Sequence, residues 1–152
     1  YGPERMGAPI TAYNRISSDV IRVHSNIYDP DFVAVVDETL LHTVDVTAGL
    51  KKEGAIIVNT AKSKEEIMPQ LNGYEGRVVT IDARTISEEA LGKYFPNSPM
   101  LAAVVATTGV MSKETFLQEM RASYKHKFAK KPEVIDGNMK ALEMAFAAVE
   151  EA

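Results

Sequence analysis

The sequence predicts an α/β fold: an open, mostly parallel, Rossmann-like sheet with helices on both faces and a helical C-terminal third. Short apolar runs alternate with helical patterning between residues 32 and 94. Parallel neighbours need a crossover connection, which a helix usually supplies. From residue 97 onward, helix starts and stops recur, and the sequence there contains no strand pattern that we recognise.

Three apolar runs have the composition of strands buried on both faces of a parallel sheet. They cover residues 32–36, 55–58 and 77–81. Upstream, residues 10–16 and 20–23 are rich in β-branched and aromatic side chains, and a polar turn separates them. This pattern predicts two further strands around a turn at the edge of the sheet.

Helices are predicted at 39–50, 63–68 and 85–94, between and after these strands. Ser63 with Glu66, and Thr85 with Glu88, have the spacing of capping boxes. Strands alternating with helices in this way are typical of a parallel sheet.

Three more helices are predicted in the last third, at 99–108 after a Ser98 cap, at 112–127 and at 132–152. Gly109 separates the first two, and Pro132 suits a first-turn position. Residues 100–106 are apolar on every side of a helix. Burial in the protein's own core is therefore favoured over contact with a partner.

Composition limits the possible functions. The 152 residues match one globular domain, and the absence of cysteine excludes disulfides and cysteine-ligated zinc or iron–sulfur sites on this chain. A net charge of -4 without a broad basic field argues against nucleic-acid binding. No apolar run approaches the roughly 20 residues of a membrane span, so we expect a soluble, cytoplasmic protein. A chain that starts at Tyr1 also suggests a missing N-terminal piece.

Familiar catalytic signatures are absent from the sequence. It contains no G-x-S-x-G elbow, Walker motif or G-x-G-x-x-G fingerprint, and its three histidines lack metal-site spacing. Ligands of parallel sheets gather at the carboxyl ends of strands. Here those ends carry a set of polar residues: Asp37, Glu38, Asn59, Thr60 and Asp82. Helix capping and turn formation are the favoured roles for these residues, and ligand binding is the alternative.

The N-terminal segment 1–9 combines two glycines and two prolines with Arg5, a planar multidentate donor. Such a stiff loop suits a binding surface or a rigid connection equally well.

Several segments taken together resemble the gamma subunit of pyruvate:ferredoxin oxidoreductase and its 2-oxoacid relatives, nearly end to end. These segments are 2–9, 21–22, 24–25, 30–33, 47–51, 57–60, 97–103 and 138–146. In that family a glycine-rich strand–loop–helix precedes the Gly-Pro-Glu-Arg segment. The resemblance therefore implies a single gamma-type domain over 1–152 that lacks its N-terminal strand and glycine-rich loop.

The resemblance implies a complex that converts a 2-oxoacid, by analogy pyruvate, and CoA into acyl-CoA and carbon dioxide while reducing ferredoxin. Thiamine diphosphate, Mg2+ and [4Fe-4S] clusters would lie on the alpha, beta and delta subunits. This chain would bind no cofactor alone, supply no catalytic residue and help to hold CoA. The positions expected to face CoA or a neighbouring subunit are Arg5, Asn59, Thr60 and Lys62.

Two other functions stay open. A pure interaction module would use the helix at 99–106 and the N-terminal loop, whereas an independent α/β enzyme would use Asp37, Glu38 and Asp82. A CoA-binding test separates the gamma-type function from the interaction module, which would not bind CoA. Turnover by the isolated chain is expected only of the independent enzyme.

Overall fold

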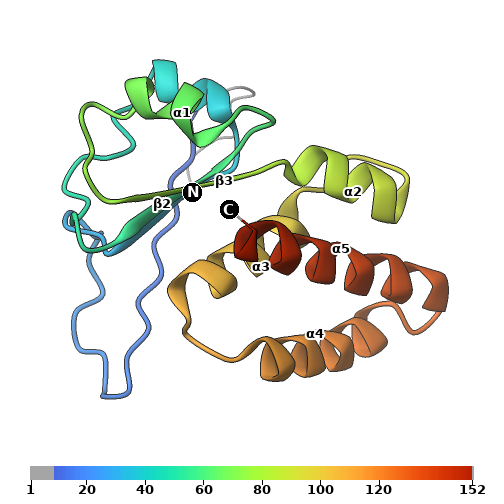
Figure 1. Ribbon diagram of the computed structural model, residues 1–152. Coiled ribbons are helices and arrows are strands. Elements are labelled where there is room, and N and C mark those ends of the chain that lie inside the picture. The colour runs from blue at the N-terminus through green and yellow to red at the C-terminus, as the bar shows by residue number, and fades with distance from the viewer. Residues whose placement is uncertain (1–8, 152) are drawn as a thin grey trace.

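The computed structural model describes residues 9–151, and its architecture is the predicted α/β type (Figure 1). Its sheet has three parallel strands in the order β1-β2-β3. They are β1 (Phe32–Val35), β2 (Ala55–Asn59) and β3 (Arg77–Ile81). The prediction of a parallel sheet built from the three apolar runs is confirmed.

Strand β2 is central, and all five of its residues are buried. Side chains alternate between the two faces of a strand. Ile57 accordingly belongs to one hydrophobic core, whereas Ile56 and Val58 belong to the other. This explains why the run is continuously apolar.

Short helical segments cover one face of the sheet. They are η1 (Glu38–His42), α1 (Lys64–Ile67) and η2 (Met68–Gln70). The opposite face carries α3 (Asn97–Thr108) and α5 (Pro132–Glu150). Helices α2 (Ala83–Leu91) and α4 (Lys113–Lys127) pack against these two helices (Figure 1). Helices on both faces and a helical C-terminal third are therefore confirmed.

The helix predicted at 39–50 is wrong beyond its first turn, because η1 ends at His42 and the chain continues through turns. Asp37 and Asp45 each accept a hydrogen bond from the backbone N–H two residues later, at Thr39 and Thr47. Such side-chain bonds stabilise turns and compete with the helical backbone pattern.

The two strands predicted at 10–16 and 20–23 are also wrong. Within the described part of the chain, residues 9–27 form no strand and no backbone–backbone hydrogen bond. Residues 9–30, which we call the arm, instead project from the sheet as a long loop (Figure 1). Strand propensity mainly reflects packing on a half-buried surface, and both limbs of the arm are exposed.

Most helix ends follow local sequence signals. Ser63 and Glu66 form the predicted capping box of α1, and Ser112 caps α4. Gly109 ends α3 in the left-handed conformation at φ 67. The capping box predicted at Thr85 is wrong, because Asp82 caps α2 and accepts a hydrogen bond from the Thr85 N–H at 3.0 Å.

Helix α3 begins at Asn97 without a side-chain cap, so the cap predicted at Ser98 is wrong. The apolar stretch within this helix is mainly core, as expected: Met100, Ala102 and Ala103 are buried between the sheet and α5. Small side chains at the last two positions allow the close approach of α5.

Candidate functional site

A hollow of about 240 Å³ lies at the carboxyl ends of the three strands. Its wall combines residues that follow β1, β2 and β3 with residues near the two ends of α2. They are Val36, Asp37, Glu38, Thr39, Asn59, Thr60, Ala61, Asp82, Arg84 and Tyr94. This is where a ligand site of an open parallel sheet is expected.

The Asn59 side chain ties the ends of the strands together. Its Nδ2 donates to the Val36 carbonyl oxygen at 2.9 Å and to the Tyr94 hydroxyl at 3.4 Å. Its Oδ1 accepts from the buried backbone N–H of Ala83 at 3.0 Å. The residue is only 8% exposed, and its amide satisfies the buried Ala83 N–H as well as the partly buried Val36 carbonyl.

Thr60 and Lys62 occupy the same edge. The Thr60 Oγ1 accepts a hydrogen bond from the Lys62 N–H at 3.1 Å, which shapes the turn after β2. The Lys62 Nζ lies 3.1 Å from Glu38 Oε2, and both side chains are partly exposed. The structure thus brings Asn59, Thr60 and Lys62 together, whereas Arg5 lies outside the described residues.

Arg84 and Tyr94 are site residues that the sequence interpretation missed. The Arg84 guanidinium carbon lies 4.1 Å from the centre of the Tyr94 ring, and the guanidinium also pairs with Glu88 at 3.7 Å. Arg84 could have been inferred from its place two residues after the Asp82 strand end. Tyr94 gives no local signal, because the left-handed turn at Gly92 returns the chain to the site.

Two of the three acidic side chains around the hollow, Asp37 and Asp82, act as caps, whereas Glu38 pairs with Lys62. Asp82 accepts hydrogen bonds from the N–H and hydroxyl of Thr85, and Asp37 accepts the equivalent pair from Thr39. The Thr39 backbone N–H, and then its hydroxyl, lower the pKa of Asp37. A carboxylate with a lowered pKa is a weak general base at neutral pH. The contacts of Asp37 and Asp82 therefore show the capping role that the sequence favoured.

The described residues carry neither a metal-binding cluster nor a membrane-spanning helix. Among residues 9–151, no group of three or more His, Cys, Asp or Glu side chains is placed to hold a metal ion. No helix in that part of the chain has the length and hydropathy needed to cross a bilayer.

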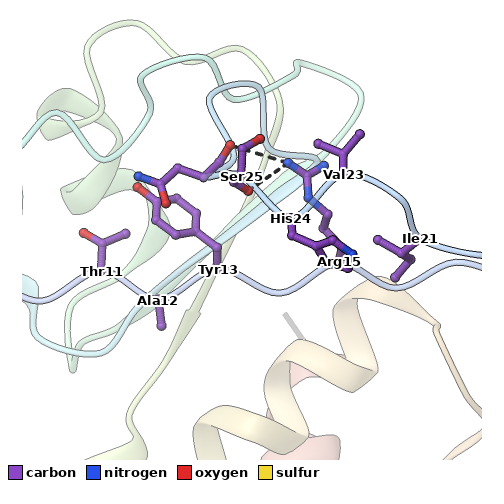
Figure 2. Close-up of a pocket in the computed structure, with 9 residues that line it drawn as sticks. Thr11, Ala12, Tyr13, Arg15, Ile21, Val23, His24 and Ser25 are labelled. Carbon is purple, nitrogen blue, oxygen red and sulfur yellow. Dashed lines mark hydrogen bonds between the residues drawn. The ribbon is translucent and has the colours of Figure 1, made fainter. Parts of the chain in front are cut away.

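A second hollow, of about 480 Å³, lies between the two limbs of the arm (Figure 2). Figure 2 shows the Arg15 side chain reaching from the first limb to the second. The hollow is lined by Thr11, Ala12, Tyr13, Arg15, Ile21, Val23, His24, Ser25 and Asn26.

Comparison with known proteins decides the family. The family model described as pyruvate ferredoxin/flavodoxin oxidoreductase matches residues 1–148. The chain belongs to this family. The resemblance in the sequence is therefore confirmed, and it covers nearly the whole chain.

Related family members are named as subunits of oxidoreductases. The chain is 42% identical over 146 residues to the "Pyruvate/ketoisovalerate oxidoreductases common subunit gamma" of Thermococcus litoralis, covering 96% of this chain and 76% of the relative. It is 38% identical over 149 residues to the "Pyruvate synthase subunit PorC" of Thermotoga maritima, covering 98% and 76%.

A solved structure supports the same relationship. The crystal structure of pyruvate oxidoreductase subunit PORC from Thermotoga maritima matches with a TM-score of 0.69 and 32% sequence identity. The match covers 80% of this chain and 64% of that chain, so the chain spans somewhat less than two thirds of its solved relative.

Proposed function

We propose that this chain is the gamma-type component of a 2-oxoacid:ferredoxin oxidoreductase, with residues 1–152 forming a single gamma-type domain. The family match over residues 1–148 is the observation that carries this proposal. Pyruvate is the proposed substrate, since the relatives' names include pyruvate synthase and pyruvate/ketoisovalerate oxidoreductases. The products would be acyl-CoA, carbon dioxide and reduced ferredoxin.

In this proposal the alpha, beta and delta subunits carry thiamine diphosphate, Mg2+ and the [4Fe-4S] clusters. These groups supply the decarboxylation and electron-transfer chemistry. The gamma-type chain contributes protein contacts to the complex and polar contacts to CoA. Its lack of cysteine agrees with the absence of a cluster-binding role for this chain.

The proposed CoA contact lies at the strand-end hollow and involves Thr60, which lines the hollow, and Lys62, which pairs with the lining residue Glu38. A volume of about 240 Å³ is small compared with pockets that enclose a whole drug-sized ligand, typically about 300–1,000 Å³. The hollow therefore suits one phosphate or one polar group of the pantetheine arm, and neighbouring subunits would enclose the rest.

In the proposed site, Glu38 and the ligand compete for the Lys62 ammonium group. Exposed pairs contribute only about 0–1 kcal/mol, so a phosphate can compete with Glu38 for Lys62. Arg84 adds a second cation on the rim, held over Tyr94. Asn59 would act as a positioning residue here, since its own amide is engaged with the strand ends.

Steady-state kinetics of the assembled complex tests this proposal. Lys62→Ala is expected to raise the KM for CoA about tenfold, because a hydrogen bond to a charged group contributes about 1.5 kcal/mol. The KM for the 2-oxoacid should stay nearly constant. Arg5→Ala is expected to act in the same direction, as proposed from its place in the N-terminal loop.

Lys51→Ala is the matched control. Lys51 pairs with Asp31 at 2.9 Å, and it lies at the amino ends of the strands, away from the hollow. It should leave both KM values unchanged. A rise in the KM for the 2-oxoacid instead, or an equal rise for CoA in Lys51→Ala, would contradict the CoA assignment.

A further inference from the structure

The arm exposes apolar side chains that the described residues 9–151 leave uncovered. Every residue from 9 to 20 and from 22 to 26 is exposed. Among them, Ile10, Ile16 and Val20 are 76%, 75% and 81% exposed, and Tyr28 near the base is 77% exposed. Scattered apolar residues are common on protein surfaces, but several large ones on one projecting segment mark an interaction site.

Most of the arm's backbone makes no hydrogen bond to other backbone groups of residues 9–151. Within the described chain, no backbone–backbone hydrogen bond involves residues 9–27. The β-branched and aromatic composition that predicted strands therefore lacks a sheet or core to pack on. Burial against another protein would cover both the apolar side chains and the free backbone groups, which water otherwise has to solvate.

Arg15 gives the arm a defined shape. Its guanidinium donates to the backbone carbonyl oxygens of Ser25 and Asn26, at 3.1 and 3.4 Å, and so bridges the two limbs (Figure 2). A bridged arm has less conformational freedom to lose on binding than an open loop of the same length. The hollow between the limbs is also maintained by this bridge.

We infer that the arm is the element by which this chain docks onto a non-identical subunit of its oxidoreductase. The seventeen exposed residues at 9–20 and 22–26 approach the roughly 20–30 residues per side of a stable interface. The partner surface would be an apolar groove with carboxylates placed to meet Arg22. This inference rests on the proposed function, which supplies the non-identical subunits.

Charge favours a different subunit over a second copy of this chain. The exposed part of the arm, residues 9–26, contains Arg15 and Arg22 against a single Asp19, while Asp29 lies at the base of the arm near Lys51; the whole chain has a net charge of -4. In a twofold contact between two arms, the same positive segments would face each other. An acidic-rimmed groove on another subunit avoids this repulsion.

Hydrogen–deuterium exchange on the full chain, alone and within the purified oxidoreductase complex, tests the inference directly. In the free chain, amides at residues 10–26 should exchange within seconds, since no backbone–backbone hydrogen bond within the described chain protects them. In the complex, their exchange should slow by at least about tenfold. Unchanged, rapid exchange of these amides in the complex would overturn the inference.

Charge substitutions provide the second measurement. Val20→Lys should weaken binding to the other subunits by about tenfold or more in a co-purification or interferometry assay. Its free energy of unfolding should not fall, because the side chain is 81% exposed. The matched control is Val44→Lys, an exposed valine near η1 on the body of the domain, and it should assemble normally.

The outcomes separate the two proposals. If the wild-type chain captures the oxidoreductase subunits and Val20→Lys captures them equally well, the docking role of the arm is wrong and the proposed function stands. If the wild-type chain captures none of these subunits, both proposals fail. Dimerisation of the chain alone that Val20→Lys abolishes would replace the inferred partner with a second copy.

Discussion

The Ser98 hydroxyl lies 2.7 Å from the Tyr124 hydroxyl and donates to Asn138 Oδ1 at 3.0 Å. These residues belong to α3, α4 and α5, so one polar chain links three helices. Asn138 completes it by donating to the Val134 carbonyl oxygen within α5. The network explains why Ser98 does not cap α3.

Removal of the Tyr124 hydroxyl is expected to destabilise the domain. Tyr124→Phe should lower the free energy of unfolding by about 1 kcal/mol, the net contribution of a typical hydrogen bond. Urea unfolding followed by circular dichroism measures this change. Tyr74→Phe is the control, since that hydroxyl donates to the Lys51 carbonyl at an exposed site where water can substitute, and it should have a smaller effect.

The same tyrosine predicts an alkaline pH dependence. Burial raises the pKa of Tyr124 above its ordinary value of 10.0, and the Ser98 hydrogen bond opposes this only partly. The folded state thus prefers the neutral phenol. This contribution to stability is fully present below pH 10.0 and is lost as the pH rises through the raised pKa. Unfolding measured across this range should show a shallower loss of stability in Tyr124→Phe than in the wild type.

Asn59 should be critical for the ends of the strands. Asn59→Ala leaves the buried Ala83 N–H and the partly buried Val36 carbonyl without their side-chain partner, so we expect a loss of about 1–3 kcal/mol. Thermal and urea unfolding report this loss. The exposed Asn14 provides the control, with little expected change in Asn14→Ala. Equal stability of the two variants would show that Asn59 does not hold the strand ends.

Two glycines in the left-handed conformation make a matched pair. Gly49 and Gly109 have φ values of 72 and 67, but only a Cβ at Gly49 would overlap the Tyr28 carbonyl oxygen. Gly109→Ala should cost roughly 1–2 kcal/mol through backbone strain alone. Gly49→Ala should cost clearly more, because the backbone at the base of the arm must also shift. Similar unfolding midpoints for both variants would contradict this steric argument.

The Lys62 and Glu38 pair yields opposite kinetic effects. Lys62→Ala should raise the KM for CoA, whereas Glu38→Gln should lower it by releasing the Lys62 ammonium from its ion pair. Both changes are measured on the complete complex at low ionic strength, where screening is weakest. Parallel shifts in the same direction would show that the pair stabilises the turn and does not compete with a ligand.

Local sequence determined much of the fold. The three strands follow from continuous apolar runs, because a strand between two helical layers must be apolar on both faces. The ends of α1, α3 and α4 follow from Ser63, Gly109 and Ser112, whose capping and left-handed conformations depend on neighbours only a few residues away. The position of the strand-end hollow also follows, since parallel strands end at one edge.

Tertiary structure decided the rest. The sequence marked Asn59 and Lys62, but their partners Val36, Ala83 and Glu38 lie some 23–24 residues away along the chain. Likewise, the residues at 10–16 and 20–23 have strand composition but no surface within the described chain on which to form a sheet. Local propensity is weak compared with burial and long-range hydrogen bonding. Those terms depend on which distant segments meet, and only the folded chain fixes that.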